Sequence, residues 1–81
     1  MARIVDEAQN VVGEKIKKYR MERKLSQKDL SEKLEVYAIY ICRGSISRIE
    51  SHERTVTDFE LRAMAKVLSV SIEELYEEKT I

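Results

Sequence analysis

The 81-residue chain contains no proline and only two glycines, Gly13 and Gly44. Because these residues are the main breakers of helices, their scarcity beside abundant Lys, Glu and Leu predicts an all-α protein. The single cysteine, Cys42, excludes an intrachain disulfide and agrees with a reducing compartment. No apolar run has the length of a membrane span or of a signal peptide, so we expect a cytoplasmic protein that does not enter membranes.

Groups that carry catalysis or bind metals are also scarce. The one histidine, His52, and the one cysteine do not form a zinc-binding pattern. No nucleophile has a neighbouring base, no glycine-rich loop would cradle a phosphate, and the carboxylates are scattered. We therefore expect neither an enzyme nor a bound cofactor or metal.

The net charge is zero, but the balance of charge changes along the chain. Residues 1–56 hold 12 Lys and Arg against 9 Asp and Glu, whereas residues 57–81 hold 3 against 6. Seven of the basic residues, Arg20 among them, lie within residues 15–28. Depending on the fold, they form either a positive binding face or an ordinary solvated helix surface.

The chain is short enough for one domain over residues 1–81. The spacing of Val12, Ile16 and Tyr19 predicts a first helix over about residues 10–23. Residues 1–9 either extend that helix or form a tail, and residues 77–81 are expected to be a C-terminal tail. If residues 1–9 are helical, their apolar stripe needs a cover, for which a second subunit is a candidate.

Four further helices are predicted from their starts and their apolar spacing. Ser26 is a good cap for the second helix, whose buried ridge is Leu30 and Leu34. Ile46 and Ile49 form the inner face of a third helix. The fourth and fifth helices open on two capping boxes, Thr57-Asp58-Phe59-Glu60 and Ser71-Ile72-Glu73-Glu74.

The second and third helices have the layout of a helix-turn-helix. Because Ile46 and Ile49 face the core, Ser47 and Arg48 are turned outward on the third helix. The start of that helix is open: Cys42 as cap places Arg43 in its first turn, whereas Ser45 as cap leaves Arg43 in the loop.

The chain resembles the lambda-repressor-like, Xre-type helix-turn-helix family from about residue 12 to residue 76. The residues that carry the resemblance are Leu25-Ser26-Gln27, Asp29-Leu30, Lys33-Leu34, Ile46-Ser47-Arg48-Ile49-Glu50, Leu61, Ala65, Leu68, Val70-Ser71 and Glu74-Leu75. The resemblance implies a compact five-helix bundle that binds double-stranded DNA, usually as a homodimer, and regulates transcription.

The resemblance also implies which residues meet DNA. Its base-reading positions are Arg43, Gly44, Ser47 and Arg48. Its phosphate-contacting positions are Gln27, Lys28, Ser51 and Arg54. Among these we expect Arg48 to contribute most, because an outward arginine can hold guanine O6 and N7 with two parallel hydrogen bonds.

The chain departs from the family pattern in the turn between the second and third helices. Leu34 and Ile46 lie 12 positions apart, about five more than a tight three- or four-residue turn allows. We expect a longer second helix followed by an extended stretch, with Ile39 and Ile41 directed inward. After the third helix, His52 stands where the family commonly has glycine, and the position favours a left-handed backbone.

Two interpretations remain for some of the residues near this turn. We expect Cys42 to fill space beneath the third helix as a small apolar residue, with a redox-sensitive thiolate as the alternative. Tyr37 and Tyr40 are expected to be packing or interface residues, although either hydroxyl could reach a phosphate.

The sequence thus favours a small dimeric repressor that reads an inverted-repeat operator through its third helix. The alternative is a protein-binding module, or an antitoxin-like adapter with a protein partner, that uses the same fold with little or no DNA binding. The lengthened turn, the zero net charge and the acidic last quarter of the chain favour this alternative.

Overall fold

The computed structural model describes residues 12–76, and within them every regular element is a helix. The predictions for residues 1–9 and for residues 77–81 fall outside the described residues. Five α-helices and one 3₁₀ turn follow one another along the chain: α2 Val12–Glu22, α3 Gln27–Leu34, η1 Glu35–Tyr37, α4 Arg43–Glu50, α5 Asp58–Leu68 and α6 Ile72–Tyr76. The predicted all-α, five-helix architecture is confirmed.

Three helices begin with reciprocal side-chain caps. At α5, Thr57 Oγ1 accepts from the Glu60 backbone N–H at 3.3 Å while Glu60 Oε1 accepts from the Thr57 N–H at 3.0 Å. At α6, Ser71 and Glu74 make the same pair of bonds. At α3, Ser26 pairs in this way with Asp29. Each pair satisfies amides that a helix start leaves without partners, so the positions of these starts are encoded locally.

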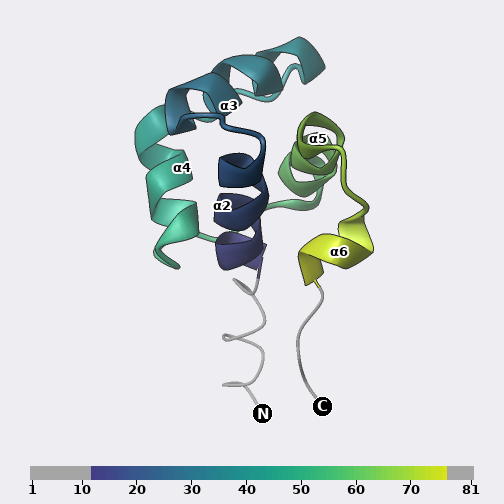
Figure 1. Ribbon diagram of the computed structural model, residues 1–81. Coiled ribbons are helices and arrows are strands. Elements are labelled where there is room, and N and C mark those ends of the chain that lie inside the picture. Colours follow the sequence, from purple (N-terminus) through teal and green to yellow (C-terminus); the bar gives the residue numbers. More distant parts are fainter. Residues whose placement is uncertain (1–11, 77–81) are drawn as a thin grey trace.

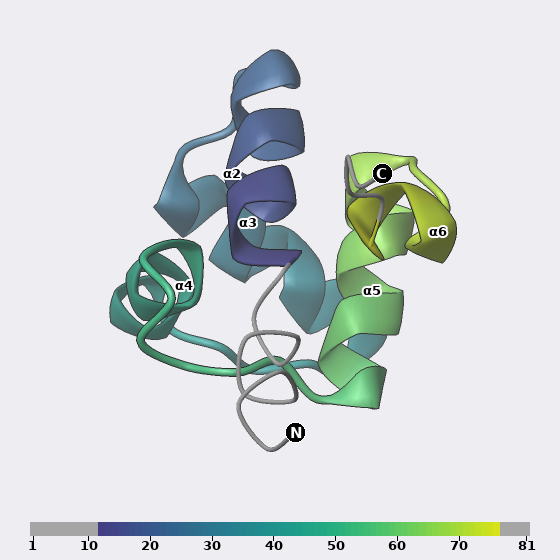
Figure 2. The same cartoon turned by 90° about the horizontal axis from the view of Figure 1, so that it is seen from below.

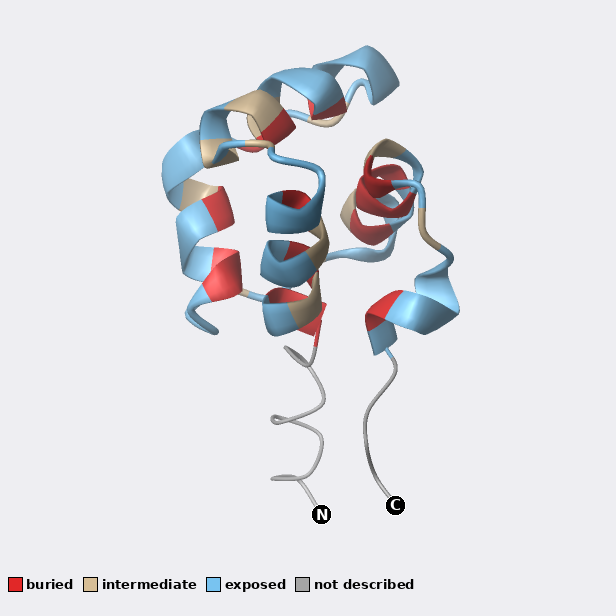
Figure 3. Cartoon of the chain, viewed as in Figure 1, coloured by how far each residue is buried: buried red, intermediate tan, exposed pale blue. Residues whose placement is uncertain are grey.

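Helix α2 lies at the centre of the bundle, with α4 on one side and α5 on the other (Figure 1). The view from below shows the same separation of α4 from α5 (Figure 2). Helix α2 packs against α4, α5 and α6, and α3 crosses one end of the bundle and packs against α4 and α5. The outer faces of these helices are exposed and their inner faces are buried (Figure 3).

The core consists of one inner face from each helix. The predicted ridge residues Leu30 and Leu34 of α3 are fully buried, as are Ile46 and Ile49 of α4. The remaining buried apolar side chains are Val12, Ile16, Ile41, Leu61, Ala63, Met64, Ala65, Leu68 and Leu75. The buried face of α4 fixes which of its side chains point outward, and this decides the candidate site.

The lengthened turn is accommodated by a second helical element. The 3₁₀ turn η1 continues α3 and ends at Ala38, whose left-handed backbone (φ 62°) turns the chain. The following residues, 39–42, belong to no helix or strand. Ile41 is buried and Ile39 is partly buried against the core, so both are directed inward as predicted. Ser31 Oγ donates to the Ile41 carbonyl at 2.6 Å and so ties this stretch to α3.

Of the predictions for the two residues that flank α4, one is confirmed and one is wrong. His52 adopts the expected left-handed conformation, with φ 68°. The prediction for Cys42 is wrong: its side chain is exposed and does not fill space beneath α4, because Cys42 is the N-cap of that helix. The cap also settles the start of the third helix, so Arg43 lies in its first turn.

Candidate nucleic-acid interface

The orientation of α4 on α3 is held by a buried ion pair. Arg20 of α2 donates from Nε to Glu50 Oε2 at 2.7 Å and from Nη2 to Glu50 Oε1 at 3.1 Å. Gln27 of α3 donates to the same Glu50 carboxylate at 3.0 Å, and Arg20 Nη1 donates to the Leu25 carbonyl at 2.7 Å. One carboxylate at the end of α4 therefore joins three segments and fixes the angle between the two helices of the motif.

This ion pair was not predicted from the sequence, in which Arg20 stands among the basic residues of a solvated or DNA-facing surface. Arg20 is in fact buried, with an exposed fraction of 9%, and its charge is neutralised by Glu50. A sequence signal was present: Arg20 follows the buried Ile16 by four positions, and Glu50 follows the buried Ile46 by four. Helical spacing therefore puts both charged residues on inward faces.

The outer face of α4 presents the expected base-reading positions together. Arg43, Gly44, Ser47 and Arg48 are all exposed. Gly44, Ser47 and Arg48 lie on the side away from Ile46 and Ile49, whereas Arg43 lies at the edge of this face, in the groove that α4 shares with the start of α3. Arg48 Nη2 donates to Ser45 Oγ at 3.2 Å, which holds its guanidinium along the helix. Two acids on neighbouring helices form ion pairs of their own: Glu32 with Lys28 at 3.6 Å, and Glu22 with Arg23 at 3.6 Å.

Gly44 has open space around it. A Cβ added there would have one neighbour within 4 Å, the Nη1 of Arg48 at 3.9 Å. Its φ is not positive, so neither backbone conformation nor packing requires glycine at this position. The absent side chain leaves the backbone of the first turn of α4 accessible to a ligand.

The expected phosphate contacts are distributed at the margins of this face. Lys28 and Gln27 lie in the first turn of α3, where they line a groove of about 600 Å³ with Ser26, Arg43, Gly44 and Ser47. Ser51 follows α4 and is exposed, with its hydroxyl donating to the Arg48 carbonyl at 3.3 Å. Gln27 and Lys28 thus lie beside the first turns of α4, and Ser51 lies at its C-terminal end.

Arg54 is placed differently from the other expected phosphate contacts. Its guanidinium is held by Glu60, with Nη1–Oε1 at 3.2 Å and Nη2–Oε2 at 2.9 Å. Burial opposes ionisation of Glu60, but the bonds from Arg54 and from the Thr57 backbone outweigh it and lower the Glu60 pKa. The pair links the loop after α4 to the cap of α5.

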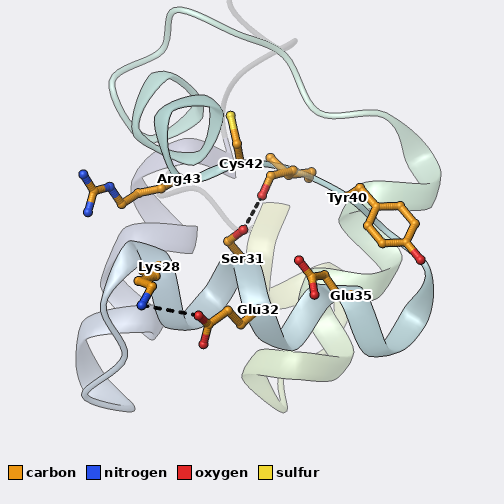
Figure 4. Close-up of a pocket in the computed structure, with 8 residues that line it drawn as sticks. Lys28, Ser31, Glu32, Glu35, Tyr40, Cys42 and Arg43 are labelled. Carbon is orange, nitrogen blue, oxygen red and sulfur yellow. Dashed lines mark hydrogen bonds and ion pairs between the residues drawn. The ribbon is translucent and has the colours of Figure 1, made fainter.

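A second groove, of about 550 Å³, continues from Lys28 and Arg43 along α3. Figure 4 shows Lys28 and Arg43 at one end of this groove and Glu35 and Tyr40 at the other. Cys42 also lines it, and its thiol pKa is lowered by a hydrogen bond with Ser45 Oγ at 3.5 Å and by the Ser45 and Gly44 amides. The end of the groove that is lined by Lys28 and Arg43 is positive, and this end adjoins the outer face of α4.

A helix held against a preceding helix, with basic side chains exposed on its outer face, is the arrangement of helix-turn-helix DNA-binding proteins. The helix-turn-helix family model that describes Xre-type, lambda-repressor-like domains matches residues 16–75. The chain belongs to this family and is a DNA-binding helix-turn-helix regulator. Searches among curated proteins and among solved structures give no significant match. Within residues 12–76 no helix is long and apolar enough to cross a membrane.

Proposed function

We propose that the protein is a sequence-specific repressor that binds DNA as a homodimer, with α4 in the major groove of each half-site. The observation that carries the proposal is the outer face of α4, where Arg43 and Arg48 are exposed on a helix whose angle is fixed by the buried Glu50. In a dimer, two such helices separated by one turn of DNA, about 34–36 Å, would read an inverted repeat. With α4 over a promoter, such a dimer would block transcription.

In this proposal Arg43 and Arg48 each read guanine, and Ser47 and Gly44 let the helix approach the base edges. Gln27 and Lys28 hold a phosphate at the start of α3, where the amides and the helix dipole favour an anion. Ser51 and Arg54 contact the phosphates beyond the end of α4. Phosphate contacts of this kind fix the position of the protein, while the arginines supply the specificity.

The proposal is tested by selection from a pool of random duplex DNA with the full-length protein. We expect enrichment of an inverted repeat whose half-sites contain guanine. The absence of any enriched sequence, for a protein shown to be folded by circular dichroism, would reject sequence-specific binding and favour the protein-binding module.

Arg48→Ala then tests the role of the central arginine. We expect the variant to lose about 1–3 kcal/mol of preference for the selected site at the guanine position while it retains weak non-specific binding. Fluorescence anisotropy with the selected duplex and with a duplex altered at that guanine measures the difference. An equal loss on both duplexes would instead make Arg48 a phosphate contact.

The dimer is tested separately, by sedimentation velocity on the full chain and on a variant without residues 1–9. If the apolar residues of that segment, Ile4, Val5 and Ala8, form the interface, the truncated chain sediments as a monomer. An unchanged profile would place the interface elsewhere.

A further inference from the structure

A surface remote from α4 combines exposed apolar side chains with basic ones that form no ion pair within residues 12–76. We call it the basic-apolar patch, and define it by six residues of the α3 end, η1 and α5: Val36, Tyr37, Phe59, Lys33, Arg62 and Lys66. Val36 and Phe59 are exposed by 82% and 75%, so two large apolar side chains are in contact with solvent. Figures 1 and 2 place α5 on the opposite side of α2 from α4, so DNA held on the outer face of α4 leaves the patch open.

The patch contains two adjacent hollows. One, of about 190 Å³, is lined by Tyr37, Ile39, Phe59, Arg62, Ala63 and Lys66. The other, of about 250 Å³, is lined by Lys33, Val36, Tyr37, Lys66 and Val67. Tyr37 and Lys66 line both hollows and contact each other, with the ammonium 5.8 Å from the ring centre. They therefore form the ridge between the two hollows.

The size of these hollows distinguishes between classes of ligand. Each is smaller than the roughly 300–1,000 Å³ of a typical small-molecule site. Two adjacent hollows, each lined in part by apolar side chains, suit the anchor side chains of an amphipathic helix, which project from one face at intervals of three or four residues.

The charge of the patch selects among protein partners. Lys33, Arg62 and Lys66 line the hollows, no Asp or Glu does so, and none of the three forms an ion pair among residues 12–76. A second copy that docked through the same patch would bring like charges together, which is unfavourable. A partner with acidic residues beside its apolar anchors complements the patch.

We propose that the basic-apolar patch docks an acidic amphipathic helix of another protein, with two apolar anchors in the hollows on either side of Tyr37 and carboxylates against Lys33, Arg62 and Lys66. This surface gives the regulator a protein contact that is independent of its DNA-binding face. Two of its six residues, Val36 and Tyr37, belong to η1 in the lengthened turn.

The proposal is tested by panning a display library of random 16-residue peptides against the full-length protein. We expect enriched peptides with two apolar residues three or four positions apart, flanked by Asp or Glu. One enriched peptide, synthesised with a fluorophore, is then titrated with variants of the protein. Failure to enrich any peptide, or enrichment of peptides without acidic residues, would overturn the proposal.

Matched variants locate the binding site. We expect Phe59→Ser and Lys66→Glu each to weaken binding of the peptide by about tenfold or more. The controls make the same changes at exposed positions outside the patch, Tyr40→Ser and Lys17→Glu, and should stay within about twofold. Replacement of a peptide glutamate by lysine should restore part of the binding to the Lys66→Glu variant. Equal losses in the patch variants and in their controls would overturn the proposal.

Two further measurements test whether DNA or a second copy of the chain occupies the basic-apolar patch. The Lys66→Glu variant should bind the selected DNA as the unchanged protein does, and a loss of DNA affinity would show that the patch is a nucleic-acid contact. The Phe59→Ser variant should sediment as the unchanged protein does, and dissociation of a dimer would show that a second copy covers the patch. Circular dichroism confirms that each variant is folded.

Discussion

Single residues of the helix-turn-helix contribute to its structure and function in different physical ways. Glu50 contributes no contact to the outer face of α4, yet its carboxylate accepts from Arg20 of α2 and Gln27 of α3. Buried ion pairs of this kind add little net stability compared with apolar residues, but the removal of one partner leaves a charge without compensation. The role of Glu50 is therefore to fix the position of α4.

Glu50→Ala should destabilise the protein by about 3–5 kcal/mol, because it leaves the Arg20 guanidinium buried without its partner. Urea denaturation followed by circular dichroism measures the change. The exposed neighbour Glu53 supplies the control: Glu53→Ala should alter stability by less than about 0.5 kcal/mol. The double variant Arg20→Met with Glu50→Leu should recover most of the loss, and a failure to recover would show that packing around the pair, not its charge, limits stability.

Gly44 offers the opposite case, a residue whose importance lies in what it leaves open. Gly44→Ala should stabilise the folded chain by up to about 1 kcal/mol, since alanine loses less entropy in a helix and its Cβ meets only Arg48 Nη1 at 3.9 Å. The same methyl group should weaken binding of the selected DNA if the first turn of α4 approaches the bases. Thermal melts and anisotropy titrations test the two effects, and unchanged DNA affinity would show that the backbone of this turn does not contact DNA.

At the level of whole elements, the helix starts were readable because their signals are local. Thr57 with Glu60, and Ser71 with Glu74, lie three positions apart and cap the same helix, so the sequence alone predicted both. The element η1 was predicted only as an extension of α3, because its boundary depends on the left-handed turn at Ala38. Cys42 was misplaced because the start of the third helix was open in the sequence, and as the N-cap of α4 its side chain is exposed.

In the candidate site, too, local features could be predicted from the sequence and contacts between elements could not. The outward direction of Ser47 and Arg48 follows from Ile46 and Ile49 on the same helix, and both side chains are exposed. The Arg20–Glu50 pair joins residues 30 positions apart. The ion pair of Arg54 with Glu60 likewise depends on how the loop after α4 returns to α5. Such contacts between elements are not visible in a local pattern.

The ion pair between Arg54, in the loop after α4, and Glu60 of α5 should make the folding stability depend on pH. The bonds from Arg54 lower the pKa of Glu60 in the folded protein below its ordinary value of 4.5. Since the unfolded chain then binds protons more readily, this contribution is complete above about pH 4.5 and is lost as the pH falls through the folded pKa. Urea midpoints at neutral and at acidic pH measure the loss.

The variant Glu60→Gln tests how much Glu60 contributes to the pH dependence of stability. It should lower stability near neutral pH and reduce the difference between the neutral and acidic midpoints, because glutamine keeps the shape of the side chain and cannot titrate. Glu53→Gln, at an exposed position, is the control and should leave the difference unchanged. If both variants show the pH dependence of the unchanged protein, Glu60 does not contribute to acid destabilisation.

For the whole molecule, zero net charge and DNA binding are reconciled by where the charges lie. The acidic excess of residues 57–81 includes Glu73 and Glu74 of α6, whereas Lys28, Arg43 and Arg48 gather where α3 meets α4. One member of the basic stretch, Arg20, is neutralised in the core and so adds nothing to this face. The charge at the junction of α3 and α4 therefore differs from the net charge of the chain, and the net charge says little about the affinity for DNA.

This division predicts a definite response to salt. The logarithm of the affinity for DNA falls linearly with the logarithm of salt concentration, by about 0.9 for each phosphate that a cation neutralises. If Lys28 holds a phosphate in each half-site, Lys28→Ala should reduce the magnitude of that slope by about 2 in a dimer. Lys66→Ala, on the far side of the bundle, should leave the slope unchanged although it removes the same charge. A reduction of the slope by both variants would mean that the charge of the whole molecule, and not the groove between α3 and α4, determines how DNA is held.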